Sequence, residues 1–326
     1  MIVVTGGAGF IGSAIVAALN ARGIKEIIIV DALDESEKWK NLVNLKFAEY
    51  EDREGFIKGI GYDEKEYRDS IEGIIHMGAC SSTTEKNSAF LMENNYKYSQ
   101  YLGEWCARNN KKFVYASSAA TYGDGKLGFL DDYIIAEQLK PLNMYGYSKH
   151  LFDLWAIRTG VIQKAAGLKF FNVYGPNEYH KGDMRSVVHK AFGQIKSEGK
   201  LKLFKSYRPD IKDGGQLRDF IYIKDAVNMT LFAYDNNLTG LFNVGTGKAR
   251  SFYDLGAAVF KAMGKAINIE YIDMPEDIRD KYQYFTQANM DRMINEFKYN
   301  EKIASLEEGV EDYVKNYLTA DDQYVK

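Results

Sequence analysis

A tyrosine and a lysine stand four positions apart in the segment YGYSK, as Tyr145 and Lys149. On a helix, this spacing places both side chains on one face. A free tyrosine has a pKa of about 10, and a neighbouring ammonium lowers the free energy needed to ionise it. The phenolate can then take a proton from an alcohol while a hydride leaves the same carbon. Because the chain contains 24 tyrosines, this spacing also arises by chance, and the pair needs support from its surroundings.

Two serines supply part of that support. Ser117 and Ser118 follow the apolar segment 113–116, which we expect to be a buried strand. Parallel sheets bind their ligands at the carboxyl ends of their strands. Ser118 is therefore expected to hydrogen bond the substrate oxygen beside Tyr145. The alternative is that both serines are only polar residues at a strand end.

A glycine-rich segment, TGGAGFIG, occupies residues 5–12. Gly6, Gly9 and Gly12 permit a tight turn and let a pyrophosphate approach the backbone at a helix N-terminus. An apolar strand precedes the segment, a helical pattern follows it, and a second apolar strand ends at Asp31. This arrangement is typical of dinucleotide binding, and a glycine turn without a ligand is the alternative.

The residues alone leave the choice between NAD and NADP open. Asp31 can hydrogen bond the 2′-hydroxyl of the adenosine ribose, which favours NAD. Lys38, Lys40 and Arg53 lie nearby in the sequence and can neutralise a 2′-phosphate, which favours NADP. The alternative is that these three are solvated surface cations.

The order of the expected elements indicates the fold class α/β. Strands alternate with helices up to about residue 175, which is typical of a Rossmann-type doubly wound parallel sheet. The alternation then weakens, although Ser251 and Asp254 have the spacing of a helix-capping pair. We expect a dinucleotide-binding domain over residues 1–170. A smaller α/β lobe that binds the substrate is expected over residues 171–326, with some segments returning to the first domain.

Composition argues against several other classes of protein. The net charge of -3 and the isoelectric point near 5.9 provide no basic excess for binding nucleic acid. Cys80 and Cys106 lack the spacing of a disulfide framework or a zinc site, and the histidines show no ligand spacing, so no metal is expected. No apolar run is long enough to span a membrane, and a strand that starts at Ile2 leaves no room for a signal peptide. We therefore expect a cytoplasmic protein.

Several motifs together resemble the extended short-chain dehydrogenase/reductases of the NAD-dependent epimerase/dehydratase type. They are the glycine segment with its acid, YASSAATYG at 115–123, and YGYSK. Three segments are more specific and are similar to the epimerases of ADP-activated heptose, namely ACSSTTE at 79–85, HKGDM at 180–184 and YQYFTQA at 282–288. The similarity runs from residue 1 to about residue 318.

The resemblance implies an isomerase that acts on a nucleotide sugar. It would convert ADP-D-glycero-D-manno-heptose to ADP-L-glycero-D-manno-heptose, a precursor of the lipopolysaccharide inner core. The implied route oxidises C6 to a transient 6-keto sugar with a tightly bound NADP and returns the hydride to the opposite face. A homo-oligomer, specifically a pentamer, is implied as well.

The resemblance also implies roles for individual residues. Tyr145, Lys149 and Ser118 would be catalytic, and Lys181 would be a second acid/base group because the two epimers present their hydroxyls from different sides. The implied cofactor-binding residues are Gly6, Gly9, Phe10, Ile11, Gly12, Asp31, Ala32, Lys38, Arg53, Met77, Gly78, Ala79, Cys80, Ser81, Asn94, Lys149 and Val173. The implied substrate-binding residues are Asn172, Asp183, Lys190, Phe204, Lys205, Ser206, Tyr207, Arg218 and Tyr282.

Two of the implied substrate contacts have competing interpretations. Arg218 suits a diphosphate because its planar guanidinium binds in a bidentate manner, and the alternative is an ion pair with Asp219 or Asp225. Lys190 stands where the family has a histidine, and His189 lies directly beside it. Position 32 also departs from the family, which has a polar residue there.

Other functions fit the residues less well. A nucleotide-sugar 4,6-dehydratase needs an extra acid and base after the strand that ends at Ser118, and this chain has Ala119 and Ala120 there. A simple NADP-linked dehydrogenase would exchange its cofactor freely, whereas an epimerase retains it. A non-catalytic NADP-sensing protein would not need the pair of Tyr145 and Lys149, which is intact.

Overall fold

Two compact units make up the chain in the computed structural model, which describes residues 1–279 and 282–326. The first unit comprises Met1–Phe170, Val227–Asn243 and Val325–Lys326. The second comprises Phe171–Ala226 and Val244–Tyr324. Helix α9 (Ile223–Asp235) begins in the second unit and continues in the first, so each unit combines segments that are distant in sequence.

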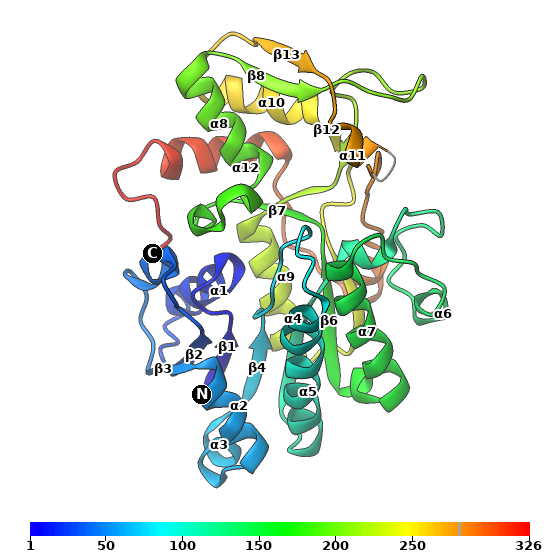
Figure 1. The fold of residues 1–326 in the computed structure, drawn as a ribbon. Helices are drawn as coiled ribbons and strands as arrows, with labels where there is room; N and C mark the ends of the chain where they lie inside the picture. The colour runs from blue at the N-terminus through cyan, green and yellow to red at the C-terminus, as the bar shows by residue number, and fades with distance from the viewer. Residues whose placement is uncertain (280–281) are drawn as a thin grey trace. The chain divides into compact units, whose positions relative to one another are not determined.

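The first unit is built around a sheet that has seven strands among the described residues (Figure 1). These strands are β1 (Ile2–Thr5), β2 (Ile27–Asp31), β3 (Glu49–Asp52), β4 (Gly73–His76), β5 (Lys112–Ser118), β6 (Ala165–Phe170) and β11 (Gly240–Val244). Their order is β11-β6-β5-β4-β1-β2-β3, and every pairing from β3 to β6 is parallel. The predicted α/β fold with a doubly wound parallel sheet is confirmed, and its strand order reverses between β1 and β4.

Helices pack against this sheet, and α5 and α7 lie side by side on one face (Figure 1). Besides most of α9, the helices of this unit are α1 (Phe10–Ala21), α2 (Arg53–Tyr62), α3 (Lys65–Ser70), α4 (Ser88–Leu91), α5 (Tyr98–Arg108), α6 (Tyr133–Ala136) and α7 (Met144–Thr159). Turns of 3-10 helix are η1 (Glu37–Leu42), η3 (Ala119–Tyr122) and η4 (Val161–Lys164), and η2 (Met92–Lys97) is a π-helical turn. No helix of the described residues combines the length and the apolar character that crossing a bilayer requires.

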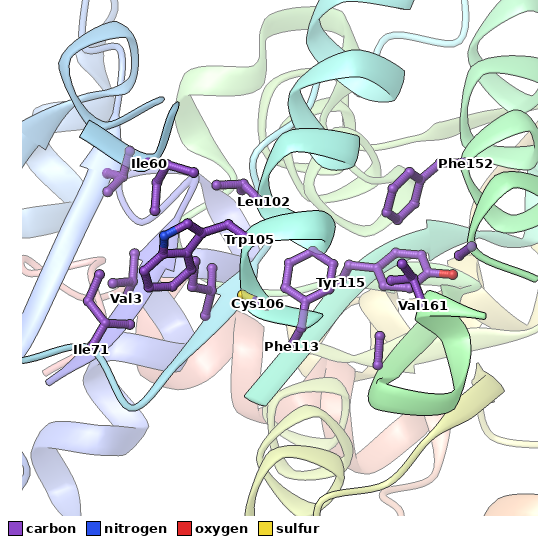
Figure 2. Close-up of a cluster of buried hydrophobic side chains, with 14 of the residues drawn as sticks. Val3, Ile60, Ile71, Leu102, Trp105, Cys106, Phe113, Tyr115, Phe152 and Val161 are labelled. Atoms are coloured by element: carbon purple, nitrogen blue, oxygen red, sulfur yellow. The ribbon is translucent and has the colours of Figure 1, made fainter. Parts of the chain in front are cut away.

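The core between these helices and the sheet is rich in aromatic side chains (Figure 2). Trp105 of α5 is 2% exposed, and its indole N–H donates a hydrogen bond to Asp63 at 2.9 Å. The rings of Phe113 and Tyr115 on β5 stack with 5.8 Å between their centroids. Phe152 of α7 meets Tyr115 edge-on with 4.7 Å between ring centroids. This packing fixes α7 against the carboxyl half of β5.

The second unit has three small sheets among the described residues. β7 (Asn172–Tyr174) pairs with β10 (Phe220–Tyr222), β8 (Leu201–Phe204) with β13 (Ile269–Ile272), and β9 (Leu217–Arg218) with β12 (Arg250–Ser251). Its helices are η5 (Tyr179–Met184), α8 (Val187–Glu198), α10 (Phe252–Ala262), α11 (Glu276–Arg279), η6 (Arg292–Glu296), α12 (Leu306–Tyr313) and η7 (Val314–Leu318). The predicted capping pair is confirmed, because Ser251 and Asp254 form a capping box at the start of α10.

Replacing Trp105 by alanine is expected to destabilise the first unit by about 3 to 5 kcal/mol, because it leaves a large cavity in a packed core. Tyr62→Ala is the matched control, since Tyr62 is 80% exposed. Urea unfolding followed by far-ultraviolet circular dichroism measures both variants. A Trp105→Ala midpoint equal to that of the control would contradict this description of the core.

Candidate active site

The tyrosine and lysine lie at the start of α7, next to the carboxyl end of β5. The side chain of Asn143 caps this helix, since its Oδ1 accepts a hydrogen bond from a first-turn N–H at 2.8 Å. Tyr145 is hydrogen bonded to Ser118, and Lys149 Nζ donates to the carbonyl of Ala116 at 2.8 Å. The fold therefore brings a phenol, a hydroxyl and an ammonium together at one strand end.

Burial controls the proton affinity of the phenol and of the ammonium. It raises the pKa of Tyr145, and the hydrogen bond with Ser118 opposes this effect. It lowers the pKa of Lys149 to about 8, and the carboxylate of Asp153 acts in the opposite direction. The sequence predicted that neighbouring groups would lower the pKa of Tyr145, whereas burial among the chain's own residues raises it. Ionising Tyr145 near neutral pH requires further positive charge beside it.

A buried carboxylate that the sequence motifs do not reveal ties α7 to β5. Asp153 lies one helical turn after Lys149 and has no exposed surface. Its Oδ1 accepts a hydrogen bond from Tyr115 at 3.0 Å, and its Oδ2 accepts from Ser117 at 2.7 Å and from Lys169 Nζ at 2.6 Å. Because a buried charge is stable only when it is paired, this arrangement fixes the helix at one height on the strand.

The glycine-rich turn after β1 is shaped by contacts that leave no room for side chains. Gly6 has a φ of 64° and its N–H donates to the carbonyl of Val30 at 2.7 Å. A Cβ on Gly12 would lie 2.1 Å from the carbonyl oxygen of Gly6. A Cβ on Gly6 would lie 2.7 Å from the backbone nitrogen of Gly78, which follows β4. The turn thus sits at the strand-order reversal and opens onto the N-terminus of α1, as a pyrophosphate site requires.

Asp31 holds the end of β2 against this turn. It is 8% exposed, and its Oδ2 accepts a hydrogen bond from the N–H of Ala8 at 2.9 Å. Its Oδ1 accepts from the N–H of Ala32 and from Lys38 Nζ, each at 2.8 Å. Lys38 also donates to the carbonyl of Ala32. The structure therefore joins three of the implied cofactor residues, and Lys38 balances the charge of Asp31.

The implied cofactor residues 77–81 follow β4 and are fixed from two sides. The N–H groups of Met77 and Gly78 donate to the carbonyl and the hydroxyl of Thr5, at 3.0 Å and 3.2 Å. On the other side, Cys80 exchanges two backbone hydrogen bonds with the side chain of Asn95, at 2.8 Å and 3.0 Å. This segment consequently lies beside the glycine turn.

Asn95 was missed by the sequence reasoning, which selected its neighbour Asn94. Asn95 has no exposed surface, and its Nδ2 also donates to the hydroxyl of Ser148 on α7 at 3.0 Å. Asn94 instead accepts a hydrogen bond from Arg53, so two implied cofactor residues contact each other. The two asparagines are adjacent in the sequence, and spacing along the chain does not reveal which of them faces α7.

A second cluster, in the second unit, surrounds the guanidinium of Arg218. This side chain is 9% exposed and lies 5.3 Å from the ring centroid of Tyr282 and 5.8 Å from that of Phe252. Phe204 meets Tyr282 edge-on, with centroids 6.5 Å apart. Arg218 Nη1 donates to the carbonyl of Leu217 at 2.8 Å. A cation among aromatic rings suits an aromatic base that carries a diphosphate.

The two carboxylates that were considered as alternative partners of Arg218 accept hydrogen bonds from backbone N–H groups instead. Asp219 accepts hydrogen bonds from the N–H groups of Thr246, Gly247 and Ala288, at 2.8 Å, 2.9 Å and 3.0 Å. Asp225 accepts from the N–H of Ala304 at 3.0 Å. These contacts hold the strands and loops around Arg218 in place.

Residues 205–207 lie on the segment after β8 and are tied to the chain near β13. Lys205 Nζ and the hydroxyl of Tyr207 both contact Asp273 at 3.1 Å. The N–H of Ser206 donates to Asp213 at 2.7 Å, and the guanidinium of Arg279 lies 4.1 Å from the ring centroid of Tyr207. Asp273 and Arg279 were missed because nothing in the local sequence links them to this loop.

The implied second acid/base group and the remaining implied substrate residues lie near η5 and β7. Lys181 is on η5, and burial lowers its pKa while Glu178 opposes that shift. Lys190 is exposed, and its Nζ donates to the carbonyl of Asp183 at 2.6 Å. The ring of His189 packs on Tyr179, and burial lowers its pKa to about 4.

Two further implied residues, Asn172 and Val173, belong to β7. Its pairing with β10 places Asn172 opposite Phe220 and Val173 opposite Ile221. The side chain of Asn172 is exposed and that of Val173 is partly buried. Both belong to the second unit, together with Lys181 and Arg218.

The sequence of the chain matches a known protein family. Residues 2–245 match the NAD dependent epimerase/dehydratase family. The chain belongs to this family. It is 54% identical to the ADP-L-glycero-D-manno-heptose-6-epimerase of Nitratidesulfovibrio vulgaris (strain DP4) over 326 residues, which is 100% of both chains.

Solved structures of the family have the same fold. The ADP-L-glycero-D-manno-heptose-6-epimerase of Helicobacter pylori superposes with a TM-score of 0.79 at 28% identity, over 97% of this chain and 95% of that one. The UDP-glucose 4-epimerase of Thermus thermophilus, solved as a complex with NAD, superposes with a TM-score of 0.76 at 25% identity, over 98% of this chain and 99% of that one.

Gly12→Ala is expected to remove nucleotide binding, because the new Cβ would meet the Gly6 carbonyl and force the turn to open. Gly55→Ala is the control, since a Cβ there has no atom within 4 Å. The nucleotide released by heat from each purified variant is measured by chromatography. Equal nucleotide content in Gly12→Ala and Gly55→Ala, with both proteins folded, would contradict the assignment of the turn.

Proposed function

We propose that the chain is an epimerase that inverts C6 of the heptose in ADP-D-glycero-D-manno-heptose, giving ADP-L-glycero-D-manno-heptose for the lipopolysaccharide inner core. The observation that carries this proposal is the 54% identity, over the whole of both chains, to a relative that bears this activity in its name. The grouping of Tyr145, Ser118 and Lys149 at one strand end supplies the chemistry that the activity needs.

The cofactor fits the cradle after β1, where side chains on Gly6 or Gly12 would collide with backbone atoms. Asp31, Lys38 and residues 77–81 line the same edge of the sheet and would hold the rest of the dinucleotide. A bound nicotinamide would supply an acceptor for the C6 hydride and a donor for its return, with no net redox change, and its oxidised ring would supply positive charge that favours ionisation of Tyr145.

The chain's own residues move the proton. Ser118 orients the C6 hydroxyl, and Tyr145 takes its proton as the carbon becomes a ketone. Lys149 stabilises the phenolate as long as its ammonium remains protonated. Lys181 is proposed to act as acid/base for the second epimer, and its pKa, lowered by burial, suits proton exchange nearer to neutral pH than a free lysine allows.

The second unit is proposed to bind the nucleotide sugar, with Arg218 on the diphosphate and Phe204 and Tyr282 at the base. Asn172, Asp183, Lys190 and residues 205–207 are proposed as further substrate contacts. The homo-pentamer and the cytoplasmic location stay predictions.

We propose NADP as the cofactor because cations accompany Asp31. Lys38 neutralises this carboxylate at 2.8 Å, which removes the repulsion that a 2′-phosphate would otherwise meet, and Arg53 offers a second positive charge. Mass spectrometry of the nucleotide released from the purified protein tests this proposal. NAD as the sole species would contradict it.

Tyr145→Phe is expected to fold and to retain its nucleotide, but to lose epimerase activity about 100- to 10,000-fold, the typical contribution of a positioned acid/base group. Tyr147→Phe is the control, because Tyr147 is 45% exposed and is two residues away. The assay incubates each protein with ADP-D-glycero-D-manno-heptose and separates the C6 epimers. Wild-type turnover by Tyr145→Phe would remove this residue from the mechanism, and no turnover by the wild-type protein would refute the proposed substrate.

A further inference from the structure

Glu178 is a buried acid that joins the two ends of the loop carrying Lys181. It is 1% exposed. Its Oε1 accepts a hydrogen bond from the hydroxyl of Ser186 at 2.6 Å, and its Oε2 accepts from the N–H of the same residue. The N–H of Gly175 lies 3.5 Å from Oε1. One carboxylate therefore closes residues 178–186 into a ring.

The loop inside this ring has a defined path. The N–H of Lys181 donates to the carbonyl of Glu178 at 3.1 Å, and that of Arg185 donates to the carbonyl of Gly182 at 3.3 Å. Gly182 has a φ of 52°, a conformation that favours glycine. Ser186 then caps α8, because its Oγ accepts a hydrogen bond from the N–H of His189 at 3.2 Å. Glu178 thus anchors the loop to the start of a regular helix.

The same carboxylate is electrostatically coupled to Lys181. Burial raises the pKa of Glu178, and its hydrogen bonds with Ser186 and the charge of Lys181 oppose that shift. Burial lowers the pKa of Lys181, and the charge of Glu178 opposes that shift in turn. The negative charge of Glu178 therefore favours the protonated lysine.

The other titratable groups around this carboxylate are mainly neutral. Tyr179 on η5 and Tyr313 on α12 both have a pKa raised by burial, with Glu178 adding to the effect. His189 on α8 has its pKa lowered to about 4 by burial, so it carries little charge near neutral pH. Arg185 and Lys190 contribute positive charge next to His189.

We propose that Glu178 is a positioning residue for the second acid/base group: its hydrogen bonds with Ser186 hold the loop of Lys181 closed, and its carboxylate keeps a negative charge at the base of that loop. The inference rests on the proposed role of Lys181. It goes beyond that role because one buried side chain, which no sequence motif identifies, would control both the position and the protonation of the lysine.

The test follows the oxidation of each epimer separately. Either ADP-heptose epimer is mixed with the NADP-loaded enzyme under single-turnover conditions. The reduced nicotinamide that forms is monitored by its absorbance over a range of pH. Lys181→Met is expected to block this half-reaction for one epimer only. If it blocks neither, the proposed role of Lys181 is wrong, and that outcome is distinct from a failure of the present inference.

Glu178→Gln is then examined with the epimer that depends on Lys181. Glutamine keeps an oxygen for the Ser186 N–H but removes the charge, so Lys181 loses its proton at lower pH. Because Lys181 must be neutral to accept a proton, the acidic limb of the rate profile is expected to move down by about one pH unit, the lower end of the effect of an adjacent opposite charge. The profile of the other epimer is expected to stay in place. An unmoved acidic limb would overturn the inference.

Glu178→Asp provides the conservative comparison and a test that does not depend on the stability of the glutamine variant. It keeps the charge but is one methylene too short to reach Ser186 in the same way. Its turnover is expected to fall while its pH profile stays near that of the wild type. A shift of the aspartate profile to lower pH would contradict the assigned charge effect.

Discussion

The hydrogen bonds of Asp153 are the constraint on which the catalytic geometry depends. Apolar contacts between α7 and β5 are non-directional, whereas a buried carboxylate needs its hydrogen-bond donors at defined positions. Asp153 fixes this turn of α7 because its carboxylate, which has no exposed surface, must meet Tyr115, Ser117 and Lys169 together. With that turn of α7 fixed, Tyr145 reaches Ser118 and Lys149 reaches the carbonyl of Ala116.

Buried carboxylates organise the other parts of the candidate site in the same way. Asp31 joins the glycine turn to β2, Asp219 accepts from two backbone segments next to Arg218, and Glu178 closes the loop of Lys181. Each of them accepts hydrogen bonds from groups that are distant in sequence or that belong to a loop. A desolvated acceptor tolerates little displacement of its donors. These acids therefore fix the positions of the glycine turn, of the loops around Arg218 and of the loop that carries Lys181.

Local spacing was sufficient to predict the strands, turns and helices that carry the candidate site within one βα unit. The glycine turn, Asp31 and the pair of Tyr145 and Lys149 were recognised from the spacing of a few residues within a motif. The parallel sheet was recognised from the alternation of apolar strands and helices. Asn95, Asp153 and Glu178 were missed because their partners are assigned only by the tertiary fold. Strand β3 was missed because its residues are mainly acidic and partly exposed. The direction of the pKa shift of Tyr145 was also inaccessible, since it depends on burial.

The dependence of the reaction on Asp153 is tested most directly by the pH profile of epimerisation in the wild type and in Asp153→Asn. In the proposed mechanism the Lys149 ammonium stabilises the phenolate, and burial lowers its pKa to about 8, so the wild-type rate is predicted to fall as pH rises through this value. Loss of the Asp153 charge removes an interaction that raises this pKa and leaves Lys169 without its carboxylate partner, so the alkaline limb is predicted to move to lower pH in the variant. An alkaline limb at the same pH in both folded proteins would contradict the account.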